Sequence, residues 1–200
     1  MNFAQLSGAR LIAAVLLLAT SLVSGFAQSS QGPGTAAPSQ PAARAGRSSR
    51  LTLMIEEWTR ARDWTRQYID KMPEGNFAFK PVPEVRSFAE QMLHLAYWNF
   101  GFTARCFGRT TPYKEADLMN GNFQSKAALS KLVTESYDFV ISGLKELPED
   151  KLDENITLGD GRITRRIVRI NDAYEHQTHH RGQTVIYLRL KGIEPPIEPF

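Results

Sequence analysis

The chain has 200 residues, 42% of them hydrophobic and 22% charged, which is typical of one globular domain with extensions. Its formal net charge of +3 is too small to indicate a nucleic-acid partner, because phosphate recognition needs a concentrated basic patch. The single cysteine, Cys106, excludes an internal disulfide and a cysteine-based zinc cluster, and it is expected to be a small buried hydrophobe.

Residues 1–27 have the pattern of a cleavable signal peptide. Arg10 precedes an apolar run at 11–19, and Gly25-Phe26-Ala27 places small residues where a signal peptidase cuts. The run is short of the roughly 20 apolar residues of a membrane-spanning helix, so an uncleaved anchor is the weaker alternative. We therefore expect an exported protein, periplasmic or secreted, that has no membrane attachment after cleavage.

Residues 28–47 are rich in Ser, Gln, Gly, Pro and Ala. Such a composition buries too little apolar surface to offset the entropy of ordering, so the segment is expected to be a disordered linker. The folded domain is then predicted to span 48–200.

Four helices are predicted in this domain, because apolar residues recur at helical spacing. The clearest start is a capping box, in which Ser87 and Glu90 each bond the other's backbone N–H, and Gly108 is expected to end the helix that begins there. The helices are expected at about 48–72, 87–107, 125–147 and 164–190, with loops at 73–86, 108–123 and 149–162, the last briefly extended at 156–158.

Three of the four histidines lie together, at positions 176, 179 and 180. His176 and His180 share one face of the predicted fourth helix, about 5–6 Å apart at Cβ, and two imidazoles so placed can bind one metal ion. His179 lies about 100° round the helix from His180 and is expected at the rim of the site. The remaining histidine, His94, lies in the predicted second helix.

The apolar stripe of the fourth helix is interrupted for two turns by the polar side chains of His176, His180 and Gln183. Burying an unpaired polar group costs about 1–3 kcal/mol, so something in the core must satisfy these side chains. A metal ion would satisfy two imidazoles at once, and His94 could complete a three-histidine site between facing helices. A pair of core histidines bonded to their neighbours is the alternative interpretation.

The sequence resembles the DinB/YfiT-like family, the DinB superfamily of metal-binding four-helix bundles. The resemblance rests on His94 within 91–96, on the block 176–183, on the tail 187–196 and on the entry 83–88. It implies an all-α, DinB-like four-helix bundle that covers roughly 51–196.

The resemblance also implies a divalent metal held by one histidine of the second helix and a His-x-x-x-His pair of the last long helix. Carried over, the ligands are His94, His176 and His180, with water in the open position. Zinc is favoured, and nickel, iron, manganese or copper are alternatives because imidazole suits several transition metals. Some family members are metal-dependent thiol transferases on small cytosolic thiols, and a related branch is maleylpyruvate isomerase-like.

Four further residues are candidates around the metal or the substrate. Glu90 and Asp172 each lie one turn before a predicted ligand and could accept its second N–H, although either could instead face solvent. Gln183 lies one turn after His180 and could orient water or substrate, and His179 is placed at the rim.

The first functional hypothesis is an enzyme that uses the open metal position, either a transferase of the thiol-transferase kind or a hydrolase, on a small-molecule substrate that the sequence does not name. The second is a non-catalytic metal- or ligand-binding module. The third is a metal-free bundle in which the histidines are structural. A homodimer is compatible with all three.

Overall fold

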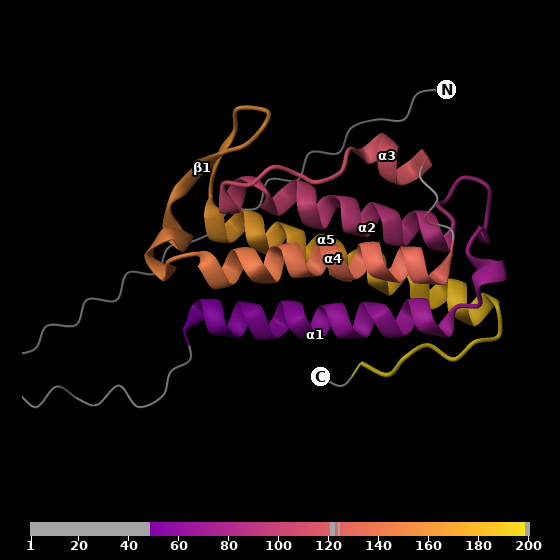
Figure 1. Ribbon diagram of the computed structural model, residues 1–200. Helices are drawn as coiled ribbons and strands as arrows, with labels where there is room; N and C mark the ends of the chain where they lie inside the picture. Colours follow the sequence, from indigo (N-terminus) through magenta and orange to yellow (C-terminus); the bar gives the residue numbers. More distant parts are fainter. Residues whose placement is uncertain (1–48, 121–122, 124, 199–200) are drawn as a thin grey trace, which may run out of the picture. The chain divides into compact units, whose positions relative to one another are not determined.

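A computed structural model describes residues 49–120, 123 and 125–198 (Figure 1). The contacts of the chain divide it into two units, Met1–Ala43 and Arg44–Phe200, and the described residues belong to the second. The predicted signal peptide (1–27) and linker (28–47) lie outside the described residues. Within 49–120 and 125–198, no helix combines the length and the apolar composition that a membrane crossing needs.

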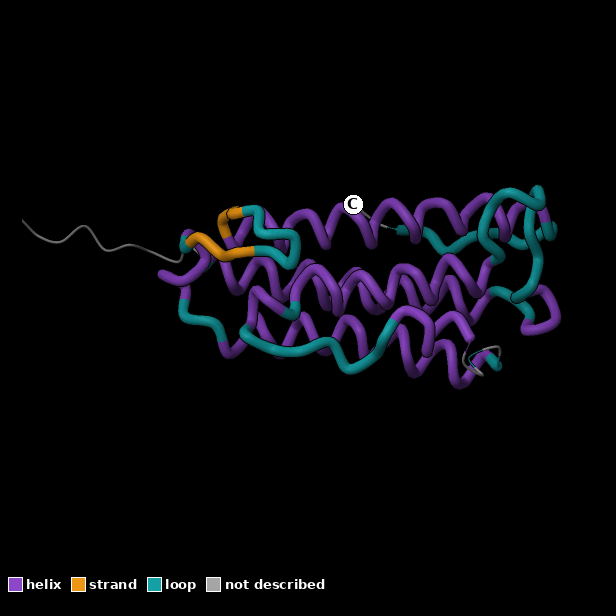
Figure 2. The backbone as a smooth tube through the Cα atoms, turned by 90° about the horizontal axis from the view of Figure 1, so that it is seen from above, coloured by secondary structure: helices purple, strands orange, loops and turns teal. Residues whose placement is uncertain are grey.

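Four long helices lie side by side, as the sequence predicts (Figures 1 and 2). The helix α2 packs on both α4 and α5, and α1 packs on α4 and, less extensively, on α5. The consecutive helices α1 and α2 are therefore diagonal to each other rather than neighbours. The bounds of the four are α1 (Arg50–Lys71), α2 (Phe88–Thr103), α4 (Lys126–Glu146) and α5 (Arg166–Leu190).

Serine side chains cap three of these helices at their N-termini. The predicted capping box is confirmed, because the Ser87 hydroxyl accepts from the backbone N–H of Glu90 and the Glu90 carboxylate accepts from that of Ser87. Ser49 and Ser125 cap α1 and α4 in the simpler way, each accepting from a backbone N–H three residues on. Each such cap stabilises its helix by about 1 kcal/mol.

Contacts between side chains fix the directions of the helices. Asn99 of α2 donates to Ser136 of α4, and Arg109, just beyond α2, donates to Ser142, so α2 and α4 run parallel. Gln91 near the start of α2 meets His180 of α5, and Arg86, just before α2, meets Tyr187 near the end of α5, so these two helices are antiparallel. Because α2 and α4 are parallel neighbours, the chain between them must return along the bundle.

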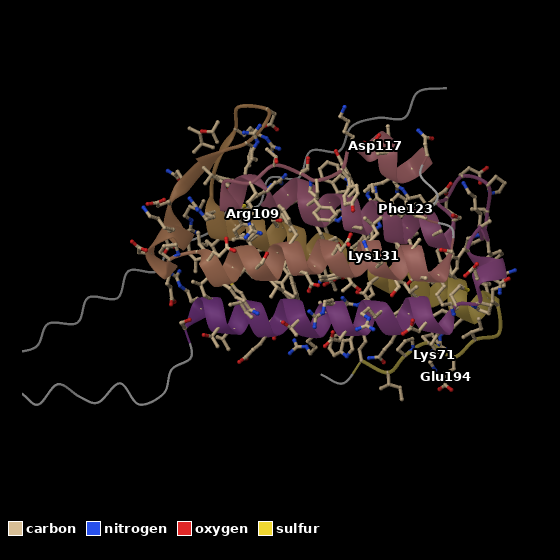
Figure 3. The ribbon with its side chains drawn as sticks, viewed as in Figure 1. Lys71, Arg109, Asp117, Phe123, Lys131 and Glu194 are labelled. Carbon is tan, nitrogen blue, oxygen red and sulfur yellow. The ribbon has the colours of Figure 1, made fainter. Side chains whose placement is uncertain are left out.

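This returning connection contains a short helix, α3 (Glu115–Asn120), where the sequence predicts a loop. The helix is only 6 residues long, so it is too short to show a helical period, and it has a single buried anchor, Leu118. Arg109, labelled in Figure 3, joins the start of the connection to α4 by donating to Phe139, Ser142 and Glu146.

The ends of the predicted elements differ slightly from the observed ones. The α-helical part of α2 ends at Thr103, and a 3₁₀ turn, η2 (Arg105–Phe107), continues to Gly108, whose φ of 64° confirms the predicted glycine stop. The expected extended piece is one strand of an antiparallel hairpin, β1 (Asn155–Thr157) with β2 (Ile163–Arg165), so α5 begins at Arg166. Two further 3₁₀ turns are η1 (Glu74–Asn76) and η3 (Glu149–Asp153).

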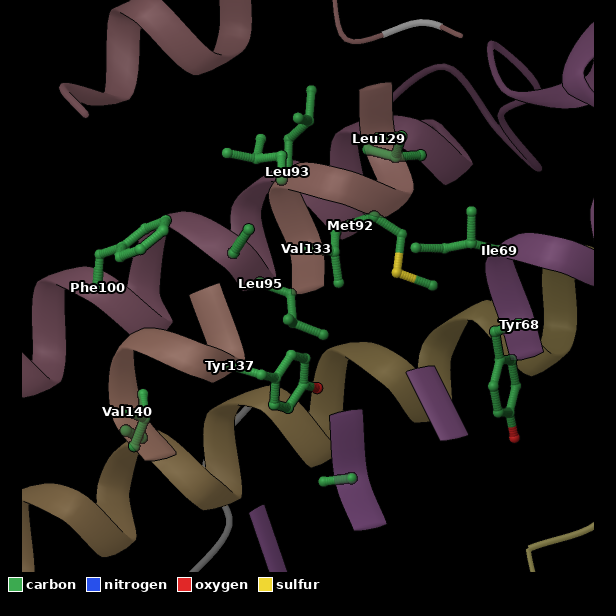
Figure 4. Packing of buried hydrophobic residues seen from close by; sticks show 14 of the residues in the cluster. Tyr68, Ile69, Met92, Leu93, Leu95, Phe100, Leu129, Val133, Tyr137 and Val140 are labelled. Atoms are coloured by element: carbon green, nitrogen blue, oxygen red, sulfur yellow. The ribbon is translucent and has the colours of Figure 1, made fainter. Parts of the chain in front are cut away.

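The core is apolar and draws on all four long helices. Figure 4 shows Ile69 of α1, Met92 of α2 and Val133 of α4 directed toward the same interior space, and each of them is completely buried. Gly143 of α4 permits one especially close approach, since a Cβ at this position would overlap the ring of Phe107. The 3₁₀ turn after α2 therefore packs directly on the backbone of α4.

Replacing Gly143 by alanine is expected to lower the free energy of unfolding by about 1–3 kcal/mol, because the added methyl group must displace the Phe107 ring. Chemical denaturation measures the change. The matched control is Gly182→Ala in α5, where a Cβ meets no atom within 4 Å, and here the free energy of unfolding should rise by roughly 0.5–1 kcal/mol. Equal effects at the two positions would contradict the packing described.

Candidate metal centre

The structure brings together the three histidines that the sequence singles out. His94 comes from α2, and His176 and His180 come from α5; one ring nitrogen of each lies within 4.8 Å of the other two. The ring centroids are 5.1 Å apart for His94 and His176, 4.5 Å for His94 and His180, and 4.4 Å for His176 and His180. Three imidazoles therefore converge on one small volume between two antiparallel helices.

Gln91, which is not among the site residues predicted from the sequence, orients one of the rings. Its side-chain oxygen lies 2.8 Å from Nδ1 of His180. When Nδ1 donates its hydrogen to this oxygen, the lone pair of a neutral His180 is on Nε2, where a metal can take it. Gln91 is a buried polar residue one turn before His94 in a mostly apolar helix, and this position is the signal that could have identified it.

The other two rings lack such partners. Nδ1 of His94 and Nδ1 of His176 are buried, and neither has a hydrogen-bond partner among the described residues. A buried polar atom without a partner costs about 1–3 kcal/mol. A transition-metal ion removes this cost by taking nitrogen lone pairs, whereas calcium and magnesium prefer oxygen ligands. The donor set therefore fits a divalent transition metal.

Aromatic side chains of α2 wall the site. Phe102 meets the His176 ring edge to face at a centroid distance of 5.2 Å, and the Trp98 ring lies 6.1 Å from His176 and 6.2 Å from His94. The pKa of His94 and of His176 is lowered to about 4 and that of His180 to about 3, chiefly by burial and, for His176 and His180, also by charge on the neighbouring histidines. The three rings are thus neutral at pH 7, the state in which imidazole binds metal.

His180 also opens onto a cleft of about 570 Å³. The cleft lies between the segment that leads into α2 and the middle of α5, so it is a route from solvent to one of the three rings. Its lining residues are Lys80, Pro83, Glu84, Val85, Arg86, Glu90, Gln91, His179, His180 and Gln183.

Two of the four further candidates lie in this cleft as a pair. Nε2 of Gln183 is 2.8 Å from Nε2 of His179, and His179 is exposed, as expected for the rim. The oxygen of the Gln183 amide is buried and has no partner among the described residues. Whichever way the amide is turned, one of its ends remains without a partner among the described residues.

The two carboxylate candidates bond to other groups. Glu90 lines the cleft, but its carboxylate accepts from the backbone of Ser87 and pairs with Lys80 at 3.0 Å. Asp172 is exposed and lies 3.7 Å from Arg169. Among the described residues, neither carboxylate hydrogen-bonds to a histidine.

A second polar cluster of α5, also absent from the sequence analysis, faces away from the histidines. The Gln177 oxygen accepts from the Tyr137 hydroxyl at 2.8 Å and from the Arg181 guanidinium at 2.7 Å. Arg181 is only 3% exposed and pairs with Glu198 of the C-terminal tail at 2.9 Å. Within the described residues this cluster is closed on itself, so it needs no ligand.

The fold and the site together define a four-helix bundle with a histidine triad capable of binding a metal. The family model described as DinB superfamily matches residues 57–184. The chain belongs to the DinB superfamily.

Known relatives have the same fold. YjoA of Bacillus subtilis, an uncharacterized protein, is 23% identical over 144 residues, which are 70% of this chain and 89% of YjoA. The crystal structure of YjoA, described as DinB-like, superposes with a TM-score of 0.58 over 72% of this chain and 96% of YjoA. A putative DinB family member from Exiguobacterium sibiricum is 19% identical, with a TM-score of 0.61 over 78% of this chain and all of its own.

A further similar structure is YfiT of Bacillus subtilis, which is described as a probable metal-dependent hydrolase with an unusual four-helix bundle topology. YfiT is 15% identical to this chain, with a TM-score of 0.57 over 76% of this chain and 93% of YfiT. At this identity the likeness establishes the fold and not the activity.

The metal-free protein is expected to lose stability as the pH falls from about 6.5 to about 4. An unfolded histidine has a pKa near 6.5, whereas the folded values are about 4 for His94 and His176 and about 3 for His180, so over this range the unfolded state binds more protons. Urea denaturation of chelator-treated protein at a series of pH values measures the loss. Because carboxylates contribute at the acid end, His180→Leu is the control, and it should make the dependence between pH 5 and pH 7 shallower.

Proposed function

We propose that the protein is an exported, metal-dependent enzyme of the hydrolase or group-transfer type that acts on a small molecule bound in the cleft. The observation that carries this proposal is the convergence of three neutral imidazoles beside a cleft onto which one of them opens. Three histidine ligands with a further position left for water or substrate are typical of catalytic metal sites, whereas structural zinc sites are closed by four protein ligands. The description of YfiT as a probable metal-dependent hydrolase supports the same class.

His94, His176 and His180 would hold the ion, with zinc favoured and nickel, iron or manganese as alternatives. When bound, such an ion acts as a Lewis acid that lowers the pKa of a coordinated water or thiol. Gln91 keeps Nε2 of His180 free for the ion by accepting from Nδ1. Trp98 and Phe102 exclude water from the α2 side, which strengthens electrostatic interactions within the site.

Two cleft residues are placed to handle the substrate. Gln183 has one amide end that a hydrogen bond to the substrate would satisfy, and the exposed His179 beside Gln183 is placed to contact the substrate as well. The chain's own thiol is not suited to be the nucleophile, because burial raises the pKa of Cys106 to about 12 and its Sγ donates to the carbonyl of Phe102. The nucleophile is therefore expected to be water or a group of the substrate.

Alanine at position 94, 176 or 180 is expected to abolish stoichiometric metal binding, because two remaining imidazoles bind an ion far more weakly than three. Elemental analysis of the reconstituted protein measures bound metal per chain. His179→Ala is the matched control and should retain the metal, and Gln91→Ala should weaken affinity by about 10–100-fold while it leaves the ligands in place. Wild-type protein with less than a tenth of an equivalent of any transition metal would refute the proposed function.

Export is tested separately. N-terminal sequencing of protein recovered from its native host should begin near Gln28, after the expected cleavage site of the signal peptide. Recovery of chains that begin at Met1 in the soluble cytosolic fraction would refute export without affecting the proposed metal centre.

A further inference from the structure

Two cationic and two anionic side chains line the cleft beside His180, namely Lys80 and Arg86, and Glu84 and Glu90. Lys80 and Glu90 pair with each other at 3.0 Å, and Glu90 also belongs to the capping box of α2, so these two groups largely cancel. The charges left to meet a ligand are those of Glu84 and Arg86.

Arg86 lines the same cleft as His180. Its side chain therefore lies on the side of the candidate metal centre where the cleft opens.

A chain of hydrogen bonds holds the backbone of Arg86 at this place. The Tyr187 hydroxyl of α5 donates to the carbonyl of Arg86, and the Gln91 amide, which accepts from His180, donates to the same hydroxyl at 3.4 Å. The next residue, Ser87, is the buried cap of α2. The position of Arg86 is thus fixed relative to His180, although its side chain is exposed.

Within the described part of the chain, the Arg86 guanidinium takes part in no ion pair or hydrogen bond, and an exposed arginine of this kind is by itself unremarkable. Arg86 is distinguished by what shares its cleft, namely a candidate metal ligand and an amide with one free end. Gln183 contributes the amide and His180 the ligand. A cation, a free amide and a metal-binding ring in one cleft are complementary to a ligand that carries an anionic group beside its reactive group.

We propose that Arg86 binds a carboxylate of the substrate, so that the cleft selects small molecules that carry a carboxylate near the group that reacts at the histidine site. The inference rests on the proposed function and specifies its substrate class. The planar guanidinium can donate two parallel hydrogen bonds to a carboxylate, which a lysine cannot do. Gln183 provides a second polar contact from the opposite wall, on α5.

The test compares a carboxylate probe with a neutral probe of the same shape. The probes are 3-mercaptopropionate and 3-mercaptopropionamide, whose common thiol can bind the metal. Mercaptoacetate and 4-mercaptobutyrate, each with its amide, shorten and lengthen the distance between the thiol and the carboxylate. Binding to the zinc-loaded full chain is measured by calorimetry, and binding to the cobalt-loaded chain by the visible absorption of the cobalt–thiolate bond. Elemental analysis afterwards checks that the metal has stayed on the protein.

For at least one length, wild-type protein should bind the acid about tenfold more tightly than the amide, the size expected of hydrogen bonds to a charged group. Arg86→Gln should bind the same amount of metal but reduce this preference to about twofold or less. Arg86→Lys keeps the positive charge but loses the paired hydrogen bonds of the guanidinium, so it should give an intermediate preference. Arg66→Gln is the matched control, since Arg66 is an exposed arginine of α1 outside the cleft, and its preference should equal that of wild type.

The outcomes separate the two proposals. A metal-loaded wild type that binds acid and amide equally at every length overturns the carboxylate inference and leaves the metal centre intact. The same conclusion follows if Arg86→Gln and Arg86→Lys hold metal and both retain the full preference. A wild type that takes up no metal overturns the proposed function and this inference together.

Discussion

The site depends on the antiparallel pairing of α2 with α5. Because α5 packs against the core, some of its polar side chains are buried. They are Gln177, His180, Arg181 and Thr184. Each needs a partner, because a buried polar group without one costs about 1–3 kcal/mol. The direction in which α5 runs past α2 decides which partners are within reach, since it sets Gln91 against His180 and His94 beside His176 and His180.

The polar side chains of α5 are satisfied in two different ways. Toward α4 and the C-terminal tail, Gln177 and Arg181 bond to Tyr137 and Glu198, and the cluster is complete within the described residues. Toward α2, His180 bonds to Gln91, whereas the buried Nδ1 atoms of His94 and His176 have no partner within the described part of the chain. A bundle selected for stability alone would be expected to close both sides. The unpaired nitrogens on the side that faces α2 therefore favour a ligand site over a closed polar core. The spacing of the histidines in the sequence does not by itself separate these two cases.

Much of this arrangement follows from local sequence, and the remainder depends on contacts between distant residues. The spacing of His176 and His180 and the polar break in an apolar stripe predict which face of α5 carries the site, and the capping box predicts where α2 begins. Gln91 and Arg181 were missed because their partners, His180 and Glu198, lie on other elements, and no local period encodes such a pairing. The short helix α3 was missed because a single buried leucine, Leu118, leaves no repeat to detect.

The diagonal placement of α1 and α2 bears on when the site can form. As the chain is synthesised, α1 has neither of its packing neighbours until α4 follows, and the three histidines can meet only after α5 is complete. With export as proposed, a chain that crosses the membrane unfolded would carry its histidines across as separate, unassembled ligands. The ion would then be acquired in the compartment where the bundle folds. The metal supply of that compartment, rather than that of the cytosol, would decide which element the protein carries.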